Sequence, residues 1–509
     1  MRPLVRRLAR IAAVALLLRS SAAPAAPAPP PPGGTMIGMY VHQHWPYKHP
    51  YAARTWTYDD WRGYTGGLKK LGYNTIIIWP MLDVMPEPPA PSDREQLEKL
   101  ARVIDMLHGE LGMRVYLTLA PNIIAHDAVA GQSTFQERHF YHCNLHVNPG
   151  DGEALDRMIR RRERQMRPLA AADGVLIIDS DPGGYPDSTN AEFVRLLAEH
   201  RAMFDRLRPG IELVYWVWFG WPAWNRYCTT GKLEWGRPEE FIEALTMFKD
   251  LEPEPWGLAH GLEPARKLGI ESRVIALQYG AIEGEPSFPL TNFGGDGAWK
   301  AGGALGPRGV IGNAQTHCLQ LPNTLAFVRG AQGRPVVEAD YLAFAGDLIA
   351  GAGEPIVEGW KALSGGDSAR RRSAAEKIEK LSAQTLGPGE LEGLLFGDPK
   401  RFLLDLACQL RYAAAAGDLQ SAAASGAGRR EPLRAYTAAL EAWYGRHGYK
   451  NIWQPPEAIA TLDSPELREL FKPHPYAETG FGRINESFYR KEVFTPRLLD
   501  ALRATLARD

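Results

Sequence analysis

Cysteine is scarce in this chain: there are four residues, Cys143, Cys228, Cys318 and Cys408, among 509. None of them forms a Cys-x-x-Cys pair, the spacing of many zinc and redox sites, so the cysteines support neither class. Without such a pattern, unpaired buried thiols are the expected state.

Charge of one sign is also lacking. The 58 Lys and Arg residues balance 59 Asp and Glu residues, which gives a formal net charge of -1. Nucleic-acid binders and basic membrane-surface proteins are usually marked by an excess of positive charge, and neither class is supported here. A glycine-rich phosphate fingerprint is missing from every strand–helix turn, which argues against nucleotide binding.

Long hydrophobic runs are absent as well. Arg6 and Arg7 precede an apolar stretch, Ile11–Leu18, that is too short to span a bilayer. Small residues with Ala-x-Ala-like cleavage options follow it, and then a Pro/Ala-rich segment, Pro24–Pro32. We predict that residues 1–32 are a signal peptide and tether, and that the mature protein is secreted or periplasmic without stable membrane insertion.

What the sequence does contain is a regular alternation of strand-like and helix-like runs over ~300 residues, the count and length of an α/β protein of the (β/α)8 TIM-barrel type. The expected strands are Met36–His42, Tyr73–Pro80, Met113–Ala120, Val175–Ile178, Ile211–Phe219, Trp256–His260, Ser272–Tyr279 and Gly309–Gln315. We expect the barrel to occupy residues 33–335. An open, doubly wound sheet is the alternative fold.

Local signals place the helices between these strands. Thr57 is predicted to cap the first helix, and Ser92 with Glu95 to form a capping box for the second. After Val336 the β-branched runs end, and residues 336–509 are predicted to form a C-terminal α-helical region. Its expected helices are Ala339–Ala350, Ser368–Leu381, Phe402–Ala415, Glu431–Tyr444 and Pro496–Leu506, with an irregular segment at Lys450–Glu492.

Two acidic residues, Asp179 and Asp181, follow the fourth strand directly. The two-residue period of a strand places both on the same side, and two like charges at that spacing push their pKa values apart. An acid beside a base is the arrangement that acid–base catalysis needs. A solvated turn at Asp181-Pro182-Gly183 is the simpler interpretation.

Polar and aromatic residues also gather at the other strand ends, which meet at one mouth in such a barrel. Amides, imidazoles and aromatic faces are the groups that bind sugars, and glycosidic bonds are cleaved with the help of carboxylic acids. Further carboxylates after strand seven are Glu283 and Glu285. The candidate substrate-binding residues are His42, His44, Trp79, Asn122, Tyr215, Trp218, Tyr279, Asn313, Gln315 and His317.

The segment Asp173-Gly174…Asp179-Ser180-Asp181-Pro182-Gly183 resembles the fourth-strand signature of secreted (β/α)8 glycoside hydrolases of the chitinase and hexosaminidase type. The resemblance implies that Asp179 orients a 2-acetamido group of the substrate, which itself attacks, and that Asp181 is the general acid. The chitinase pattern differs in phase and ends in Glu, and the adjacent acid pair of the β-hexosaminidases is absent.

Other interpretations remain open. Many barrel glycosidases resemble this chain in placing an acid/base on strand four and a nucleophile on strand seven, which would make Asp181 the acid/base and Glu283 or Glu285 the nucleophile. The pair His42 and His44 resembles the zinc-binding pattern of amidohydrolases, and a catalytically inactive carbohydrate-binding barrel is the non-enzymatic alternative. We predict a carbohydrate substrate with no cofactor, metal or nucleic-acid partner, and the sequence leaves the oligomeric state open.

Overall fold

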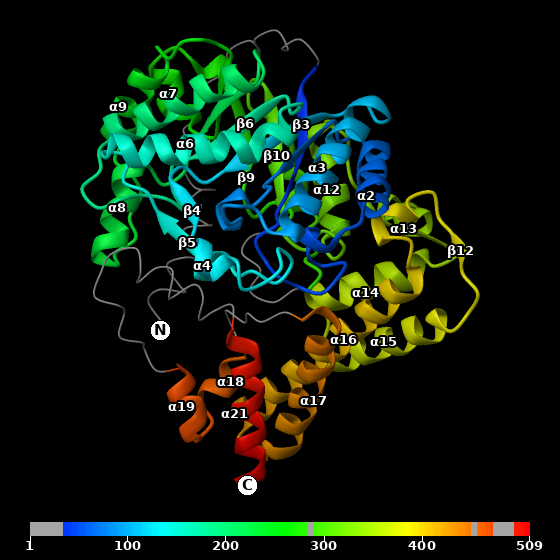
Figure 1. The fold of residues 1–509 in the computed structure, drawn as a ribbon. Coiled ribbons are helices and arrows are strands. Elements are labelled where there is room, and N and C mark those ends of the chain that lie inside the picture. The colour runs from blue at the N-terminus through cyan, green and yellow to red at the C-terminus, as the bar shows by residue number, and fades with distance from the viewer. Residues whose placement is uncertain (1–33, 284–289, 449–455, 472–492, 509) are drawn as a thin grey trace.

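The structure, a computed structural model, describes residues 34–283, 290–448, 456–471 and 493–508. Eight parallel strands close into a barrel in the order β1-β10-β9-β8-β7-β6-β3-β2 (Figure 1). Because β1 pairs with β10, the open-sheet alternative is wrong and the (β/α)8 prediction is confirmed. The strands are β1 Met36–Val41, β2 Thr75–Ile78, β3 Arg114–Leu119, β6 Gly174–Ile178, β7 Glu212–Trp216, β8 Trp256–Ala259, β9 Val274–Gln278 and β10 Gly309–Ala314.

The strands are apolar on both faces because side chains fill the barrel on one face and helices cover the other; every residue of β2 and β6 is buried. The main covering helices are α2 Tyr58–Leu71, α3 Pro91–Gly109, α6 Gly152–Met166, α7 Asn190–Leu207, α9 Pro238–Phe248, α10 Leu262–Lys267, α11 Asp296–Gly303 and α12 Leu321–Ala331. Shorter elements lie in the connections: α4 Asp127–Ala130, α5 Phe140–Cys143, α8 Trp221–Thr230 and the hairpin β4 Ile123–Ala125 with β5 Asn144–His146.

One helix start agrees with its sequence signal and one does not. Thr57 caps α2 as predicted, with Asp60 closing the capping box. The box predicted at Ser92 is wrong, because α3 begins earlier, at Pro91, and Asp93 accepts the hydrogen bond from the Ala90 amide. Proline has the dihedral angle of a first helical turn, and this advances the start of the helix. The Ser92 hydroxyl instead accepts a hydrogen bond from the Phe135 amide.

A helical region follows the barrel and lies below it in Figure 1. Its elements are α13 Glu338–Leu348, α14 Gly353–Gly365, α15 Ser368–Ser382, α16 Pro399–Ser425, α17 Arg430–His447, α18 Glu457–Ala460, α19 Pro465–Phe471 and α21 Phe494–Arg508, with a short β11–β12 pair, Ile349–Ala350 and Gly387–Pro388. The core of the barrel continues into the first helices of this region, and a second apolar cluster holds the last ones together.

Two details of this region differ from the sequence prediction. Helix α14 was not predicted, because its glycines weaken the helical signal. The segment Lys450–Glu492 was expected to be irregular, yet its described part forms α18 and α19. The predicted signal peptide and tether, residues 1–32, lie outside the described residues. None of the described helices combines the length and apolar character that crossing a membrane requires.

The helical region is tied to the barrel mouth through a buried carboxylate. Asp405 of α16 accepts hydrogen bonds from Tyr51, which lies in the loop between β1 and α2, and forms ion pairs with Arg401 and Arg446. The same loop is held again at Lys48, whose amide and ammonium donate to main-chain carbonyls at the end of α17. Since this loop follows directly on β1, the helices help to hold the mouth in place.

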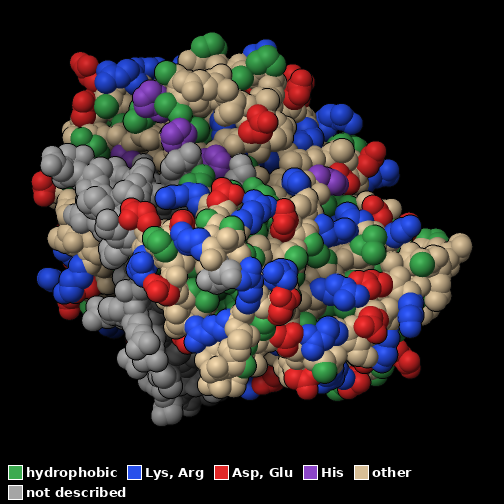
Figure 2. Space-filling model, turned by 90° about the horizontal axis from the view of Figure 1, so that it is seen from below, with side chains coloured by type: hydrophobic (Ala, Val, Ile, Leu, Met, Phe, Trp, Pro, Cys, Tyr) green, Lys and Arg blue, Asp and Glu red, His purple; other side chains and the backbone are tan. Residues whose placement is uncertain are grey.

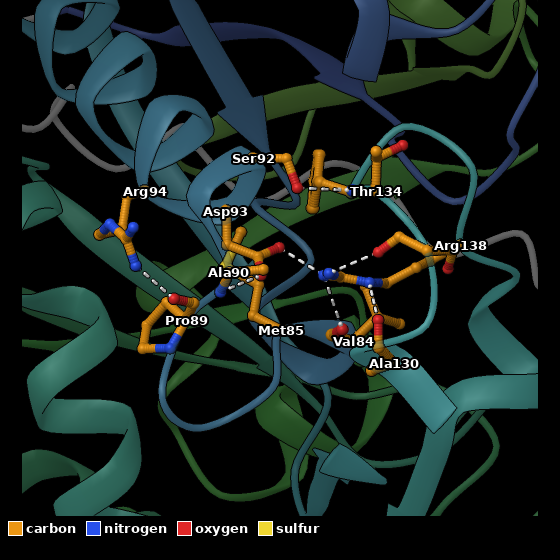
Figure 3. A network of polar contacts seen from close by, with 12 residues as sticks. Val84, Met85, Pro89, Ala90, Ser92, Asp93, Arg94, Ala130, Thr134 and Arg138 are labelled. Atoms are coloured by element: carbon orange, nitrogen blue, oxygen red, sulfur yellow. Dashed lines mark hydrogen bonds and ion pairs between the residues drawn. The ribbon is translucent and has the colours of Figure 1, made fainter. Parts of the chain in front are cut away.

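A second buried network holds the connection after β3 (Figure 3). The Arg138 guanidinium is fully buried, forms an ion pair with Asp93 and donates to the carbonyls of Val84, Ala130 and Ser133. A buried charge is tolerated only when it is paired and hydrogen-bonded, and the Arg138 guanidinium meets both conditions. On the molecular face seen in Figure 2, by contrast, acidic and basic side chains are interspersed.

We predict that Arg138→Met lowers the free energy of unfolding by about 3–5 kcal/mol, because it leaves the Asp93 carboxylate buried without its cation. Denaturant unfolding followed by circular dichroism measures the change. As the matched control, Arg62→Met removes the exposed pair with Glu110, whose side chains are 59% and 43% exposed. It should cost no more than about 1 kcal/mol. Equal effects of the two substitutions would contradict the role given to Arg138.

Candidate active site

A pocket opens at the carboxyl ends of the barrel strands, the place where chemistry occurs in this fold. Its empty volume is about 550 Å³, counting the solvent at its mouth. The lining comes from the ends of β1, β2, β6, β7, β9 and β10 and from α5. The lining residues are Tyr40, His42, His44, Trp45, Trp79, Tyr141, Ile178, Asp181, Trp216, Trp218, Tyr279 and Gln315.

Two histidines at the end of β1 contact one another in this pocket. The Nδ1 atoms of His42 and His44 lie 2.5 Å apart, so one ring donates and the other accepts. That arrangement requires the accepting ring to be neutral. Burial lowers the pKa of His42 to about 3 and holds the pKa of His44 well below its usual value. The buried guanidinium of Arg54 donates to the carbonyls of Gln43 and His44 and thereby fixes the backbone of the pair.

The Trp79 ring is held from behind. Its indole Nε1 donates to Asp83 over 2.8 Å, and Asp83 lies 3.3 Å from Arg162. Burial raises the pKa of Asp83 while the guanidinium lowers it, so the pair offsets the cost of burying either charge alone. Arg162 also donates to the carbonyls of Ala120, Pro121 and Ile123, which ties the end of β3 to the same support. Against the front of Trp79, His44 packs edge to face at 4.2 Å between ring centroids.

Asp181 lines the pocket, whereas Asp179 does not. The strict alternation of a strand would keep the two on one side, but Asp181 has a φ of 50°, in the left-handed region, so the chain turns there. Non-glycine residues adopt this conformation at a cost and are concentrated at functional sites. The carboxyl of Asp181 is half-buried and comes from the same strand end as Ile178.

Asp179 is fully buried and serves as a hydrogen-bond acceptor for the segment after β7. It accepts from the amides of Trp218 and Gly220 at 3.0 and 3.2 Å, from the Tyr215 hydroxyl at 3.1 Å and from the Ser180 hydroxyl at 2.6 Å. Burial raises its pKa to about 6, and these donors limit the rise. Asp179 therefore links the end of β6 to the backbone that carries Trp218.

Glu283 plays a comparable part on the other side of the mouth. One carboxyl oxygen accepts from the amides of Gln315 and Thr316, both at 2.6 Å, and the other from the Thr316 hydroxyl and the Gln320 amide group. The side chain is buried, which raises its pKa. Glu283 thus positions Gln315, a lining residue, without lining the pocket itself. Glu285 lies outside the described residues.

Six of the ten substrate-binding candidates line the pocket: His42, His44, Trp79, Trp218, Tyr279 and Gln315. The other four lie behind it with protein partners. Asn122 donates to the carbonyls of Val147 and Gly184, Asn313 to that of Glu283, and Tyr215 to Asp179. His317 is buried with the Tyr64 hydroxyl 3.0 Å from its Nδ1, and burial lowers its pKa to about 3.

Five lining residues were not among the candidates: Tyr40, Trp45, Tyr141, Ile178 and Trp216. Strand parity could have found two of them, because Tyr40 precedes His42, and Trp216 precedes Trp218, by two residues. The Trp45 indole donates to Gln315. The Trp216 Nε1 is buried and has no hydrogen-bond partner among the described residues.

In the described part of the chain, no group of three or more His, Cys, Asp and Glu side chains could hold a metal ion. His42 and His44 bond to each other, and His260, which follows β8, lies beside Trp218 with 6.0 Å between ring centroids. The residues present therefore do not fit the zinc site that this resemblance implies.

No protein-family model matches the chain, and no curated protein matches its sequence. Solved structures resemble its fold distantly. A family 89 glycoside hydrolase from Clostridium perfringens shares 12% identity at a TM-score of 0.44, covering 93% of this chain and 64% of the other. An O-GlcNAc hydrolase from Thermobaculum terrenum shares 10% identity at a TM-score of 0.40, covering 93% of this chain and 94% of the other. A family 20 β-N-acetylglucosaminidase shares 9% identity at a TM-score of 0.35, covering 58% of this chain and 68% of the other.

We predict that Asp179→Ala lowers the unfolding temperature, because the amides of Trp218 and Gly220 are left without an acceptor in a buried place. Each unsatisfied buried donor costs about 1–3 kcal/mol. Calorimetry measures the loss. The exposed acid Asp187 in the same loop offers a control, since Asp187→Asn removes a charge in contact with solvent and keeps a residue type that tolerates the left-handed φ of 59° at this position. An unfolding temperature unchanged in both variants would show that Asp179 does not hold this segment.

A second prediction concerns acid stability. The pKa of His42 is about 3 in the folded chain, far below the usual 6.5 that it regains on unfolding. The unfolded state therefore takes up a proton that the folded state refuses, and stability present above pH 6.5 is lost as the pH falls toward 3.

His42→Gln cannot titrate, so its unfolding temperature should fall less between pH 7 and pH 4.5 than that of the unmodified protein. Thermal unfolding at the two pH values measures the difference. His49→Gln, at an exposed loop position, should keep the original acid response. If His42→Gln loses as much as the unmodified protein, His42 is not held neutral.

Proposed function

We propose that the chain is a glycoside hydrolase whose active site is the pocket at the barrel mouth, with Asp181 as the general acid. The observation that carries the proposal is the setting of this carboxyl, which enters a pocket otherwise lined by aromatic rings, two neutral imidazoles and an amide. Sugar rings present apolar faces and hydroxyl edges, and this lining matches both kinds of surface.

Each part of the lining has a role in the proposed complex. The faces of Trp79, Trp218 and Tyr279 take the apolar face of a sugar ring. The imidazoles and the Gln315 amide can donate to or accept from hydroxyls.

In the proposed reaction, Asp181 protonates the glycosidic oxygen as the bond to the anomeric carbon breaks. Asp181 is the one carboxylate among the described lining residues. Asp179 and Glu283 each accept four hydrogen bonds from the protein, so we assign them to positioning. This geometry favours the substrate-assisted route, in which the carbonyl oxygen of a 2-acetamido group attacks the anomeric carbon. Water then opens the cyclic intermediate and returns the proton to Asp181.

The test is a panel of aryl glycosides that includes N-acetylhexosaminides, simple hexosides and hexuronides. We expect cleavage of at least one member and a loss of about 10²–10⁴-fold in kcat for Asp181→Asn, the usual contribution of a general acid. Sugar affinity and unfolding temperature should stay near those of the unmodified protein. Asp187→Asn is the matched control and should retain full turnover.

The choice of substrate tests the route separately. If the acetamido group attacks, aryl N-acetylhexosaminides should be cleaved and the matching hexosides without that group should not. Cleavage of both classes at similar rates would point to a protein nucleophile, and Glu283 and Glu285 would return as candidates. Absence of cleavage across the panel, with sugar affinity unaffected by Asp181→Asn, would remove the basis for a hydrolase.

A further inference from the structure

The rim of the pocket continues into an exposed row of rings. Trp218 and Tyr279, both lining residues, lie 5.4 Å apart between ring centroids, and Trp235 lies 5.7 Å from Trp218. Trp235 is outside the lining and is 40% exposed, and Tyr279 is 38% exposed. These are two of the five large apolar side chains exposed in the described part of the chain, and both contact the same ring.

The exposed ring of Trp235 is supported from beneath. One face stacks on Phe219 at 4.5 Å between centroids with 25° between the planes, and Phe219 is itself buried. A small apolar cluster of Phe219, Trp224 and Cys228 underlies the contact. Trp235 therefore does not need to reorganise in order to offer its remaining surface to a ligand, which lowers the cost of binding.

The backbone next to Trp235 is fixed as well. The Gly236 amide donates to the Phe219 carbonyl over 2.7 Å. A Cβ at this position would lie 2.8 Å from that same carbonyl oxygen and 2.9 Å from the Phe241 ring, so the close approach requires glycine. On the other side, the Trp218 amide is held by Asp179. The backbone of Trp218 is therefore held by Asp179, and the backbone next to Trp235 is held by the Phe219 carbonyl, so separate contacts fix the two tryptophans.

We propose that Trp218, Trp235 and Tyr279, here called the aromatic platform, bind the sugar units that follow the one in the pocket, so that the substrate is an oligosaccharide chain rather than a single glycoside. The inference rests on the proposed function and extends it to the substrate class. The platform is continuous with the pocket, because Trp218 and Tyr279 line the pocket and Trp235 contacts Trp218. A sugar chain that leaves the pocket over Trp218 would therefore meet Trp235.

The surroundings favour a carbohydrate over a protein partner. Three rings offer far less apolar area than the ~800 Å² per partner that a stable protein interface buries. Polar groups border the rings: Lys232 and Glu234 form an exposed ion pair at 2.5 Å, and His260, also exposed, lies 6.0 Å from Trp218. Alternating rings and hydrogen-bonding groups suit a chain of sugars, whose faces are apolar and whose edges carry hydroxyls.

The test compares tetrasaccharides with their monosaccharides on the full chain carrying Asp181→Asn, so that binding is measured without turnover. Chitotetraose, cellotetraose and xylotetraose serve as probes in titration calorimetry. We expect at least one tetrasaccharide to bind at least tenfold more tightly than its monosaccharide. Trp235→Ala should remove about tenfold of that affinity and leave the monosaccharide affinity within twofold, and Trp235→Phe, which keeps a ring, should restore most of it.

The control is Leu305→Ala, since Leu305 is 43% exposed and precedes β10 at the opposite end of the barrel; it should change no affinity. Equal weakening of both ligand lengths by Trp235→Ala, no weakening of either, or no tetrasaccharide binding at all would overturn the platform. If one of these outcomes is found but aryl glycosides are cleaved, the platform is rejected and the proposed function stands. Conversely, Trp235-dependent binding of tetrasaccharides without cleavage of any glycoside would retain the platform and reject the hydrolase.

Discussion

The pocket depends on carboxylates that are buried next to it and satisfied by main-chain amides. Asp179 and Glu283 lie on opposite sides of the mouth, and each accepts two amide hydrogen bonds from the residues that follow a neighbouring strand. Such charge-assisted hydrogen bonds fix the backbone of the loops that follow the strands, beyond the end of the sheet. Two residues that line the pocket, Trp218 and Gln315, are carried on the two segments held in this way.

This arrangement explains why acidic residues at strand ends need not be catalytic. A carboxylate at the end of a buried strand can either enter the pocket or turn under it, and the choice is made by one backbone angle. At Asp181 the left-handed turn brings the side chain to the pocket, while Asp179 two residues earlier remains among its donors. Desolvation costs for the buried group are met by hydrogen bonds, which is the general condition for a charge in the interior.

The barrel was readable from the sequence because its strands are apolar on both faces and bounded by Pro, Gly and polar residues. Six of the ten binding candidates also reached the pocket, since position at a strand end is nearly sufficient in this fold. The sequence did not show which strand-end residues lie at the pocket surface and which are buried behind it. Asn122, Asn313 and His317 carry amide and imidazole groups at strand ends, as the lining residues Gln315, His42 and His44 do. Long-range partners such as the Gly184 carbonyl and the Tyr64 hydroxyl nevertheless hold Asn122 and His317 behind the surface. Tyr141 reaches the pocket from a connecting helix, which no strand pattern could indicate.

Under the proposed function, the neutral histidine pair has a consequence for which sugars the pocket would accept. The described lining contains no Lys or Arg, and both imidazoles are held uncharged, so none of the described lining side chains carries a positive charge. A uronate, sialate or sulfate ester entering here would give up its hydration without meeting a counter-ion. Under the proposed function, the electrostatics of the cavity would therefore disfavour anionic glycans and favour sugars that carry only hydroxyls and amides.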